Sequence, residues 1–195
     1  MAISADTAAQ VWGGTWRMPT KAEFESLIAN TNYTWETNFN DSGVNGGKFT
    51  DKIDNSKYVF FAAASYWLDG SQYAFGGIGE YWSSTPYDSS HAYNMYFSNG
   101  HEDTSYSDRK SGYSVRGVLD SVTTTVETTI EHKVDKYATK EELGITFDAN
   151  GHEYVDLDLP SGTLWATMNV GATSPTEVGG YYMYGHGTEA YEPWN

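Results

Sequence analysis

The sequence predicts an α+β fold, mostly antiparallel β-sheet with one or two short helices. Residues 92–98 alternate between apolar and polar side chains, which is typical of a strand with one buried face. Asn150 and Gly151 lie between two extended segments and indicate a β-hairpin. Thr20 and Glu23 have the spacing of a capping box, which begins a helix. At 195 residues, the chain suits one medium domain or one domain with an appendage.

The N-terminal part of the chain is predicted to contain one helix followed by a loop. Pro19 ends an extended segment, and the capping box then begins a helix over residues 21–29. The apolar side chains of this helix fall on one face: Phe24, Leu27 and Ile28. Residues 38–56 are rich in Asn, Asp and Gly, which predicts an irregular loop with room for one hairpin.

Strands are predicted between this loop and residue 119. Their ranges are 58–64, 79–84, 92–98 and 113–118, with a turn at 98–100. In the third strand, one set of side chains is expected to face the core: Tyr93, Met95 and Phe97. The alternate set is expected to face outward: Asn94, Tyr96 and Ser98.

Residues 120–144 differ from their surroundings and are predicted to be a connector or, alternatively, a fibre stalk. The spacing of their apolar residues is compatible with a helix. The run is too short, and too rich in β-branched residues, to predict a coiled coil. Residues 139–142 match a second capping box. Beyond the predicted hairpin, apolar residues alternate with aspartates: Val155, Leu157 and Leu159. Further strands are predicted at 164–168 and 180–184.

Composition excludes several classes of protein. There is no cysteine, so disulfides and thiol chemistry are excluded. A net charge of −15 repels phosphate backbones, so nucleic acid is not an expected partner. No stretch approaches the roughly 20 apolar residues of a membrane span, and the first residues show no signal peptide. Aromatic residues make up 16% of the chain, which suits a recognition surface, a Trp-rich core, or both.

Several motifs resemble those of the major paralogous (FISUMP-type) domain of gut Bacteroidetes and their phages. They are VDLDLPSGTLWATMNVGA at 155–172, WGGTWRMPTKAEF at 12–24, YWSS at 81–84 and SVR at 114–116. In that family the first stretch precedes the others, whereas here it follows them. The chain therefore looks circularly permuted, or cut from a larger protein across a repeat or protomer boundary. The resemblance implies a C-terminal-type half at 1–119, a connector or short stalk at 120–144, and an N-terminal-type half at 145–195.

This resemblance implies a C-type lectin-like fold that serves as a non-enzymatic ligand-recognition module. Relatives that generate formylglycine work through cysteines, which this chain lacks. The implied setting is extracellular, at a cell surface or on a virion, as an adhesin or a phage receptor-binding tail fibre. The implied partner is a host cell-surface protein or glycan, and a homo-oligomer through residues 120–144 is left open. Residues 16–20, 82–84 and 114–116 are expected to be scaffold, with Trp16 packed and Arg17 bridging backbone carbonyls or a carboxylate.

The candidate ligand surface is the segment 85–110, which is dense in Tyr, Ser, Asp, Asn and His. Related proteins diversified by retroelements carry their variable surface here, so the resemblance implies a diversified recognition surface; an ordinary polar hairpin is the alternative. The predicted ligand-binding residues are Tyr87, Asp88, His91, Asn94, Tyr96, His101, Asp103, Tyr106 and Asp108. Asn94 and Tyr96 are expected to point outward from a strand and the other seven to lie in turns. Asn, Asp and His would supply hydrogen bonds, and Tyr would supply stacking contacts.

No metal ligand set, cofactor or catalytic site is predicted. Residues 192–195 (EPWN) only superficially match the acid-Pro-Asn triplet with which C-type lectins bind calcium and sugar, although the acidic loops leave a structural calcium ion open. No nucleophile elbow, zinc-protease motif or phosphate-binding loop is present. Two alternatives remain: a carbohydrate- or calcium-binding lectin-like domain of a bacterial surface lipoprotein, and a purely structural assembly domain.

Overall fold

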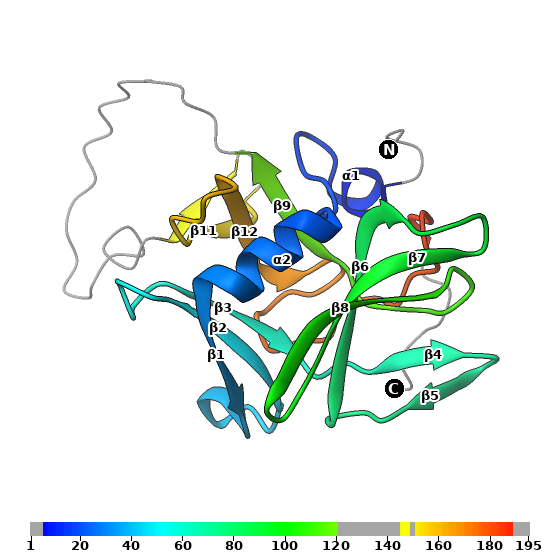
Figure 1. Ribbon diagram of the computed structural model, residues 1–195, viewed down its shortest axis with the longest axis horizontal. Coiled ribbons are helices and arrows are strands. Elements are labelled where there is room, and N and C mark those ends of the chain that lie inside the picture. The colour runs from blue at the N-terminus through cyan, green and yellow to red at the C-terminus, as the bar shows by residue number, and fades with distance from the viewer. Residues whose placement is uncertain (1–5, 121–144, 149–150, 189–195) are drawn as a thin grey trace.

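The computed structural model describes residues 6–120, 145–148 and 151–188, which form two short helices and a series of β-strands (Figure 1). The helices are α1 (Thr7–Trp12) and α2 (Lys21–Asn30), and a 3-10 turn, η2, spans Phe39–Asp41. The strands are β1 (Thr31–Glu36), β2 (Gly46–Asp51), β3 (Tyr58–Ala62), β4 (Tyr66–Leu68), β5 (Ser71–Tyr73), β6 (Ile78–Pro86), β7 (His91–Ser98), β8 (His101–Asp108), β9 (Arg116–Asp120), β10 (Ile145–Phe147), β11 (Glu153–Asp156) and β12 (Thr163–Asn169).

Within these residues the strands pair antiparallel in four small sheets. Their strand orders are β1-β2-β3, β10-β11-β12-β9, β4-β5 and β6-β7-β8. Figure 1 shows α2 lying across the middle of the molecule, with β11 and β12 on one side and the β6-β7-β8 sheet on the other. The predicted class, mostly antiparallel β with one or two short helices, is confirmed.

Helix α2 begins where the sequence predicts it. The Thr20 hydroxyl accepts a hydrogen bond from the Glu23 N–H at 3.2 Å, and the Glu23 carboxylate accepts one from the Thr20 N–H at 2.8 Å. This reciprocal pair satisfies two backbone N–H groups that would otherwise lack partners at the helix start. Helix α1 was not predicted; Asp6 caps it by accepting a hydrogen bond from the Ala9 N–H at 3.0 Å.

Two parts of the chain, here called the first block (residues 6–120) and the second block (residues 145–148 and 151–188), share one core. Trp165 of the second block is fully buried between Phe24 of α2 and Phe61 of β3, with ring centroids 5.5 and 6.0 Å away. The blocks also share a sheet, because β12 pairs with β9. The alternating residues of the second block are buried in the same core: Val155, Leu157 and Leu159.

Side chains from separate motifs meet in one buried hydrogen-bond chain. Arg116 is fully buried, and its Nε donates to Asn169 Oδ1 at 3.0 Å. Its two Nη atoms donate to the carbonyls of Ala166 and Phe60, each at 2.7 Å. Asn169 in turn donates to the Tyr81 hydroxyl at 3.0 Å. These contacts give Tyr81, Arg116 and Asn169 a structural role, which the sequence predicts for Arg116.

The scaffold role expected of Trp16 and Arg17 is also found. Trp16 is 2% exposed, and its Nε1 donates to Asp148 Oδ2 at 2.7 Å. The Arg17 guanidinium donates to both Glu23 oxygens, at 2.6 and 2.8 Å, and also bonds Asp120. Arg17 therefore bridges carboxylates, one of the two roles predicted for it.

Some local predictions are wrong. The range 38–56, predicted to be an irregular loop with room for one hairpin, is irregular only in part, because it contains strand β2, which pairs with both β1 and β3. The strand was not predicted because it begins with glycines, which are uncommon in strands. A Cβ on Gly46 would lie 2.2 Å from the Phe61 carbonyl oxygen, so the close pairing requires glycine there. Residues 180–184 form only an isolated bridge, between Tyr182 and Tyr113. Asp120, predicted to begin the connector, instead ends strand β9, and the rest of the connector, with the second capping box, lies outside the described residues.

Candidate functional site

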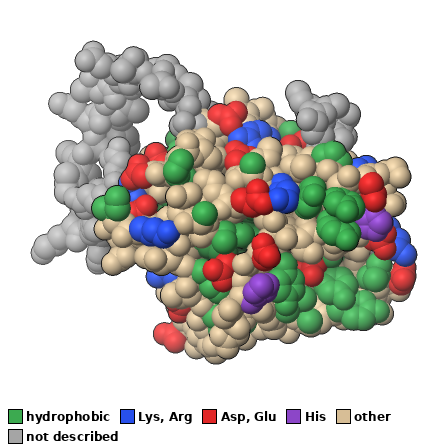
Figure 2. All heavy atoms as spheres, viewed as in Figure 1, with side chains coloured by type: hydrophobic (Ala, Val, Ile, Leu, Met, Phe, Trp, Pro, Cys, Tyr) green, Lys and Arg blue, Asp and Glu red, His purple; other side chains and the backbone are tan. Residues whose placement is uncertain are grey.

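Five predicted ligand-binding residues gather at one end of the β7-β8 hairpin: Tyr87, Asp88, His91, Tyr106 and Asp108. The rings of Tyr87 and Tyr106 stack with centroids 4.0 Å apart, and they are 48% and 50% exposed. His91 and Tyr93 pack edge-on against both rings. We call Tyr87, His91, Tyr93 and Tyr106 the tyrosine cluster. Figure 2 shows hydrophobic side chains gathered over this sheet and over the β4-β5 hairpin.

Hydrogen bonds hold the turn beneath the tyrosine cluster. Asp88 Oδ1 accepts from the N–H groups of Ser90 and His91, each at 2.7 Å. The Ser90 N–H is the main cause that lowers the pKa of Asp88, and His91 adds to the effect. His91 lies between two carboxylates, with Nδ1 3.0 Å from Asp88 and Nε2 3.4 Å from Asp108. Arg109 donates to the backbone carbonyls of Asp88 and His91. These hydrogen bonds therefore fix the turn that carries the exposed rings.

Three other predicted residues lie at the opposite end of the hairpin, near its turn. Tyr96 is directly across from Asp103, and the rings of Tyr96 and His101 are 5.8 Å apart. His101 and Asp103 are exposed and Tyr96 is partly buried. This group is separate from the tyrosine cluster along the strands. The nine predicted residues therefore do not form one site.

Two predictions about this hairpin are corrected by the structure. Asn94 is not outward-facing but only 1% exposed, because the face opposite Met95 is covered by a second core cluster that contains Trp82 and Tyr113. Five residues placed in turns lie instead on strands: His91 begins β7, and His101, Asp103, Tyr106 and Asp108 lie on β8, which pairs with β7 along its whole length. Strand β8 is exposed or partly exposed throughout, so it carries no hydrophobic alternation that would reveal it.

A hollow of about 400 Å³ opens beside the tyrosine cluster, where β4, β6 and β8 approach one another. We call it the Glu80 hollow; its lining residues are Tyr66, Leu68, Glu80, His91, Tyr106, Ser107, Asp108, Ser111 and Tyr113. Three of these were predicted ligand-binding residues. Tyr66, Glu80 and Tyr113 were missed, because they come from separate segments and Glu80 directly precedes the YWSS motif, which was assigned to the scaffold.

Glu80 is the buried acid of this hollow. It is 9% exposed, and its Oε2 has no hydrogen-bond partner among the described residues. Burial raises the pKa of Glu80, and a hydrogen bond with Tyr113 opposes that rise. Burial also raises the pKa of Tyr113, and the nearby Glu80 adds to this effect. Glu80 and Tyr113 therefore interact with each other in a hollow that is lined in part by aromatic rings.

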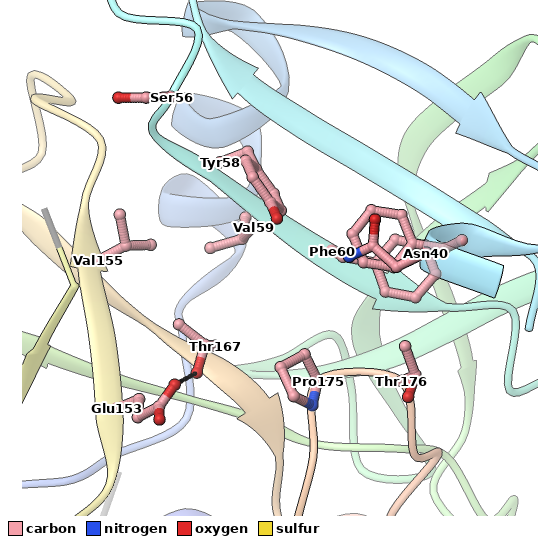
Figure 3. Close-up of a pocket in the computed structure, with 11 residues that line it drawn as sticks. Asn40, Ser56, Tyr58, Val59, Phe60, Glu153, Val155, Thr167, Pro175 and Thr176 are labelled. Atoms are coloured by element: carbon pink, nitrogen blue, oxygen red, sulfur yellow. Dashed lines mark hydrogen bonds between the residues drawn. The ribbon is translucent and has the colours of Figure 1, made fainter. Parts of the chain in front are cut away.

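A second cavity, of about 240 Å³, lies between the two blocks (Figure 3). Its walls are mainly apolar, with Val59 of β3 and Val155 of β11 on opposite sides. At one edge the Thr167 hydroxyl donates to Glu153 at 3.3 Å. The cavity has room for an apolar group, and it contains none of the predicted ligand-binding residues.

Among the described residues, no group of three or more His, Asp or Glu side chains lies close enough together to hold a metal ion. Neither helix in the same part of the chain has the length and apolar character needed to cross a membrane. The expectations about calcium, catalysis and membranes remain predictions.

Comparison with known proteins assigns the first block to a family. The family model described as the Lcl C-terminal domain matches residues 1–119, which is more than half of the chain. No curated protein and no solved structure matches the chain. The matched range contains the motifs WGGTWRMPTKAEF, YWSS and SVR, together with the tyrosine cluster and the Glu80 hollow. The chain belongs to the Lcl C-terminal domain family.

Proposed function

We propose that the protein is a non-enzymatic recognition module that binds its ligand with the tyrosine cluster and the adjoining Glu80 hollow. The exposed, stacked pair of Tyr87 and Tyr106 is the observation that carries this proposal. Tyrosine offers a large amphipathic contact with few rotatable bonds, so little entropy is lost on binding. Hydrogen bonds through Asp88 and Arg109 already fix the turn that bears the rings. This preorganisation lowers the cost of association further.

The proposed partner is a host cell-surface protein or glycan, and the proposed setting is an adhesin or a phage receptor-binding tail fibre outside the cell. Support comes from the resemblance to the major paralogous domain and from the composition of residues 85–110. The Tyr, Asp and His side chains of the surface provide both apolar faces and hydrogen-bonding groups. The same resemblance supports the proposal that this segment is diversified by a retroelement.

We also propose that the fold is C-type lectin-like, with its two halves in permuted order. The supporting observation is that the blocks share one interior: Trp165 packs on Phe24, and β12 pairs with β9. The chain of Arg116, Asn169 and Tyr81 joins motifs from both blocks. Such contacts are expected if the second block completes the domain begun by the first.

The test is a double variant, Tyr87→Ser with Tyr106→Ser, probed on arrays of glycans and of host cell-surface proteins. Binding of the double variant is expected to fall by about tenfold or more, because both stacking surfaces are lost. The matched control is Phe147→Ser, which removes another exposed ring, 48% exposed and on β10. Both variants should melt close to the wild type.

Each result on the arrays has a consequence. Unchanged binding by the double variant contradicts the proposal and favours a structural assembly domain. Glycan binding that is lost when a chelator is added favours the calcium-dependent lectin alternative. Binding to a protein that persists in chelator and depends on the two tyrosines supports the proposal.

A further inference from the structure

The Glu80 hollow contains a buried carboxyl group that is only partly satisfied, through its hydrogen bond with Tyr113. The Glu80 carboxylate is 9% exposed, and one of its oxygens has no partner among the described residues. Burying a carboxylate is costly unless a cation or several donors compensate it. No Lys or Arg is among the residues that line the hollow. A positive group that enters the hollow would lie beside this carboxyl group and favour its ionised form.

Two tyrosine rings stand at nearly right angles on the wall of the hollow. The ring planes of Tyr66 and Tyr113 meet at 71°, with centroids 5.9 Å apart. Tyr73 stacks on Tyr66 at 5.1 Å, and Trp82 stacks on Tyr113 at 4.3 Å, so each ring is held by another. Aromatic faces attract cations, and rings set at an angle can contact one cation from two sides.

The charges around the hollow favour a cation as well. Asp108 is on its wall, and the chain carries a net charge of −15. The two basic residues that follow Asp108 are engaged elsewhere: Arg109 lies over the Tyr184 ring, and Lys110 is 4.0 Å from Asp69. His91 lies between two carboxylates. An anionic ligand would be repelled here, whereas an ammonium group would be attracted.

We propose that the Glu80 hollow binds an alkylammonium group, seated against the rings of Tyr66 and Tyr113 near the Glu80 carboxylate. This inference rests on the proposed function and names the chemical group that the ligand presents. The shared chemistry has two sources: a free quaternary or primary amine, and a lysine side chain on a partner protein. A hollow of about 400 Å³ has room for either head group.

The experiment titrates the protein with choline and, separately, with N-acetyl-lysine methylamide, following the tyrosine ring resonances by NMR. The neutral analogue 3,3-dimethylbutan-1-ol has the shape of choline without its charge. Choline or the lysine analogue is expected to bind about tenfold or more tightly than the neutral alcohol. Tighter binding of choline indicates a free amine as the ligand, and tighter binding of the lysine analogue indicates a partner's side chain.

Variants separate this site from general charge effects. Glu80→Gln and, independently, Tyr66→Leu are expected to weaken amine binding by about tenfold. The control Asp103→Asn makes the same charge change at an exposed position at the far end of the hairpin, and it should bind as the wild type does. If Glu80→Gln fails to fold, Tyr66→Leu still tests the site, because it leaves the acid in place.

Equal binding of choline and the neutral alcohol, or equal losses in Asp103→Asn and Glu80→Gln, would overturn the inference. So would the absence of any response to both amines. If the amines fail but the Tyr87 and Tyr106 double variant still loses its array partner, the recognition function stands and only the ammonium site is refuted.

Discussion

Arg116 connects β9 to β3 and to β12 through its hydrogen bonds. It is fully buried, donates to Asn169 and to two backbone carbonyls, and its guanidinium lies 4.4 Å from the centroid of the Phe61 ring. Burial lowers the pKa of Arg116 to about 10, so the group remains charged at neutral pH. The planar fork of an arginine makes these bonds together, which a lysine ammonium cannot do.

Replacing Arg116 with Lys should therefore destabilise the protein by about 3 kcal/mol or more, because buried carbonyls lose their donors. The free energy of unfolding from urea denaturation measures the effect. Lys110→Ala serves as the control, since that side chain is 60% exposed and its loss should change stability by less than about 0.5 kcal/mol. Equal effects of the two changes would contradict this role of Arg116.

Glu23 of helix α2 accepts hydrogen bonds from residues of both blocks. Burial alone would raise the pKa of Glu23, but hydrogen bonds from Arg17, from the Thr20 backbone and from Thr163 lower it to about 2. The ordinary value is 4.5, so the folded state holds the ionised form more strongly than the unfolded state does. The stability from this difference is fully present above pH 4.5.

Stability should fall as the pH drops from about 4.5 towards 2, and Glu23 should contribute on the order of 2 kcal/mol to that fall. In Glu23→Gln this part of the pH dependence disappears, because the amide does not titrate. The measurement is the free energy of unfolding between pH 2 and 7 for both proteins. Parallel curves would refute the assignment.

At the scale of single elements, the sheet β6-β7-β8 depends on close contact between a glycine and an aromatic ring. A Cβ on Gly79 of β6 would lie 2.0 Å from the ring of Phe97 on β7. Phe97 is fully buried among the rings of Phe49, Phe61 and Tyr81, so it has little room to move. Glycine is therefore required at this point of the strand.

Gly79→Ala should cost about 1–3 kcal/mol through overpacking, with the loss measured by thermal or urea unfolding. Gly77→Ala is the matched control, since the nearest atom to its Cβ would be the Ala74 carbonyl oxygen at 3.5 Å, an ordinary contact. If Gly79→Ala is no less stable than Gly77→Ala, the packing account fails.

The elements that the sequence predicts well are those with strong local signals. The capping box at Thr20 and Glu23 begins α2, and the turn at Gly151 joins β10 to β11. Strand β8 was missed because its side chains are polar on both faces. Its identity as a strand comes from pairing with β7, a long-range contact that local periodicity does not contain.

At the scale of the whole molecule, neither block has a complete core of its own. Without the second block, Phe24 and Phe61 would lose Trp165, and β9 would lose its partner β12. Exposing this apolar surface removes part of the hydrophobic burial that drives folding. The two blocks should therefore unfold together.

A truncated chain ending at residue 120 is expected to show no cooperative unfolding transition by near-ultraviolet circular dichroism. Adding a peptide of residues 145–195 should restore the transition, because it returns β12 and Trp165. In the full chain, tryptophan fluorescence and circular dichroism should report one common midpoint. A stable, cooperatively folded truncated chain would contradict the shared core.

The candidate site could be predicted only in part, because its residues come from segments that are far apart in the sequence. Residues 85–110 stood out by composition, and His91, Tyr106 and Asp108 from that segment do line the Glu80 hollow. Tyr66 and Glu80 come from other segments, and only the folded arrangement brings them there. Asn94 was misplaced because the sequence does not reveal that a second core cluster covers the outer face of β7.

Strand β8 lies at the edge of its sheet, and none of its side chains belongs to a hydrophobic core cluster. Its outward positions can therefore be exchanged with little effect on folding, whereas the neighbouring strand β7 carries Met95 and Phe97 in the interior. Substitutions confined to this one strand can therefore change the chemistry of the surface while the rest of the architecture is inherited intact.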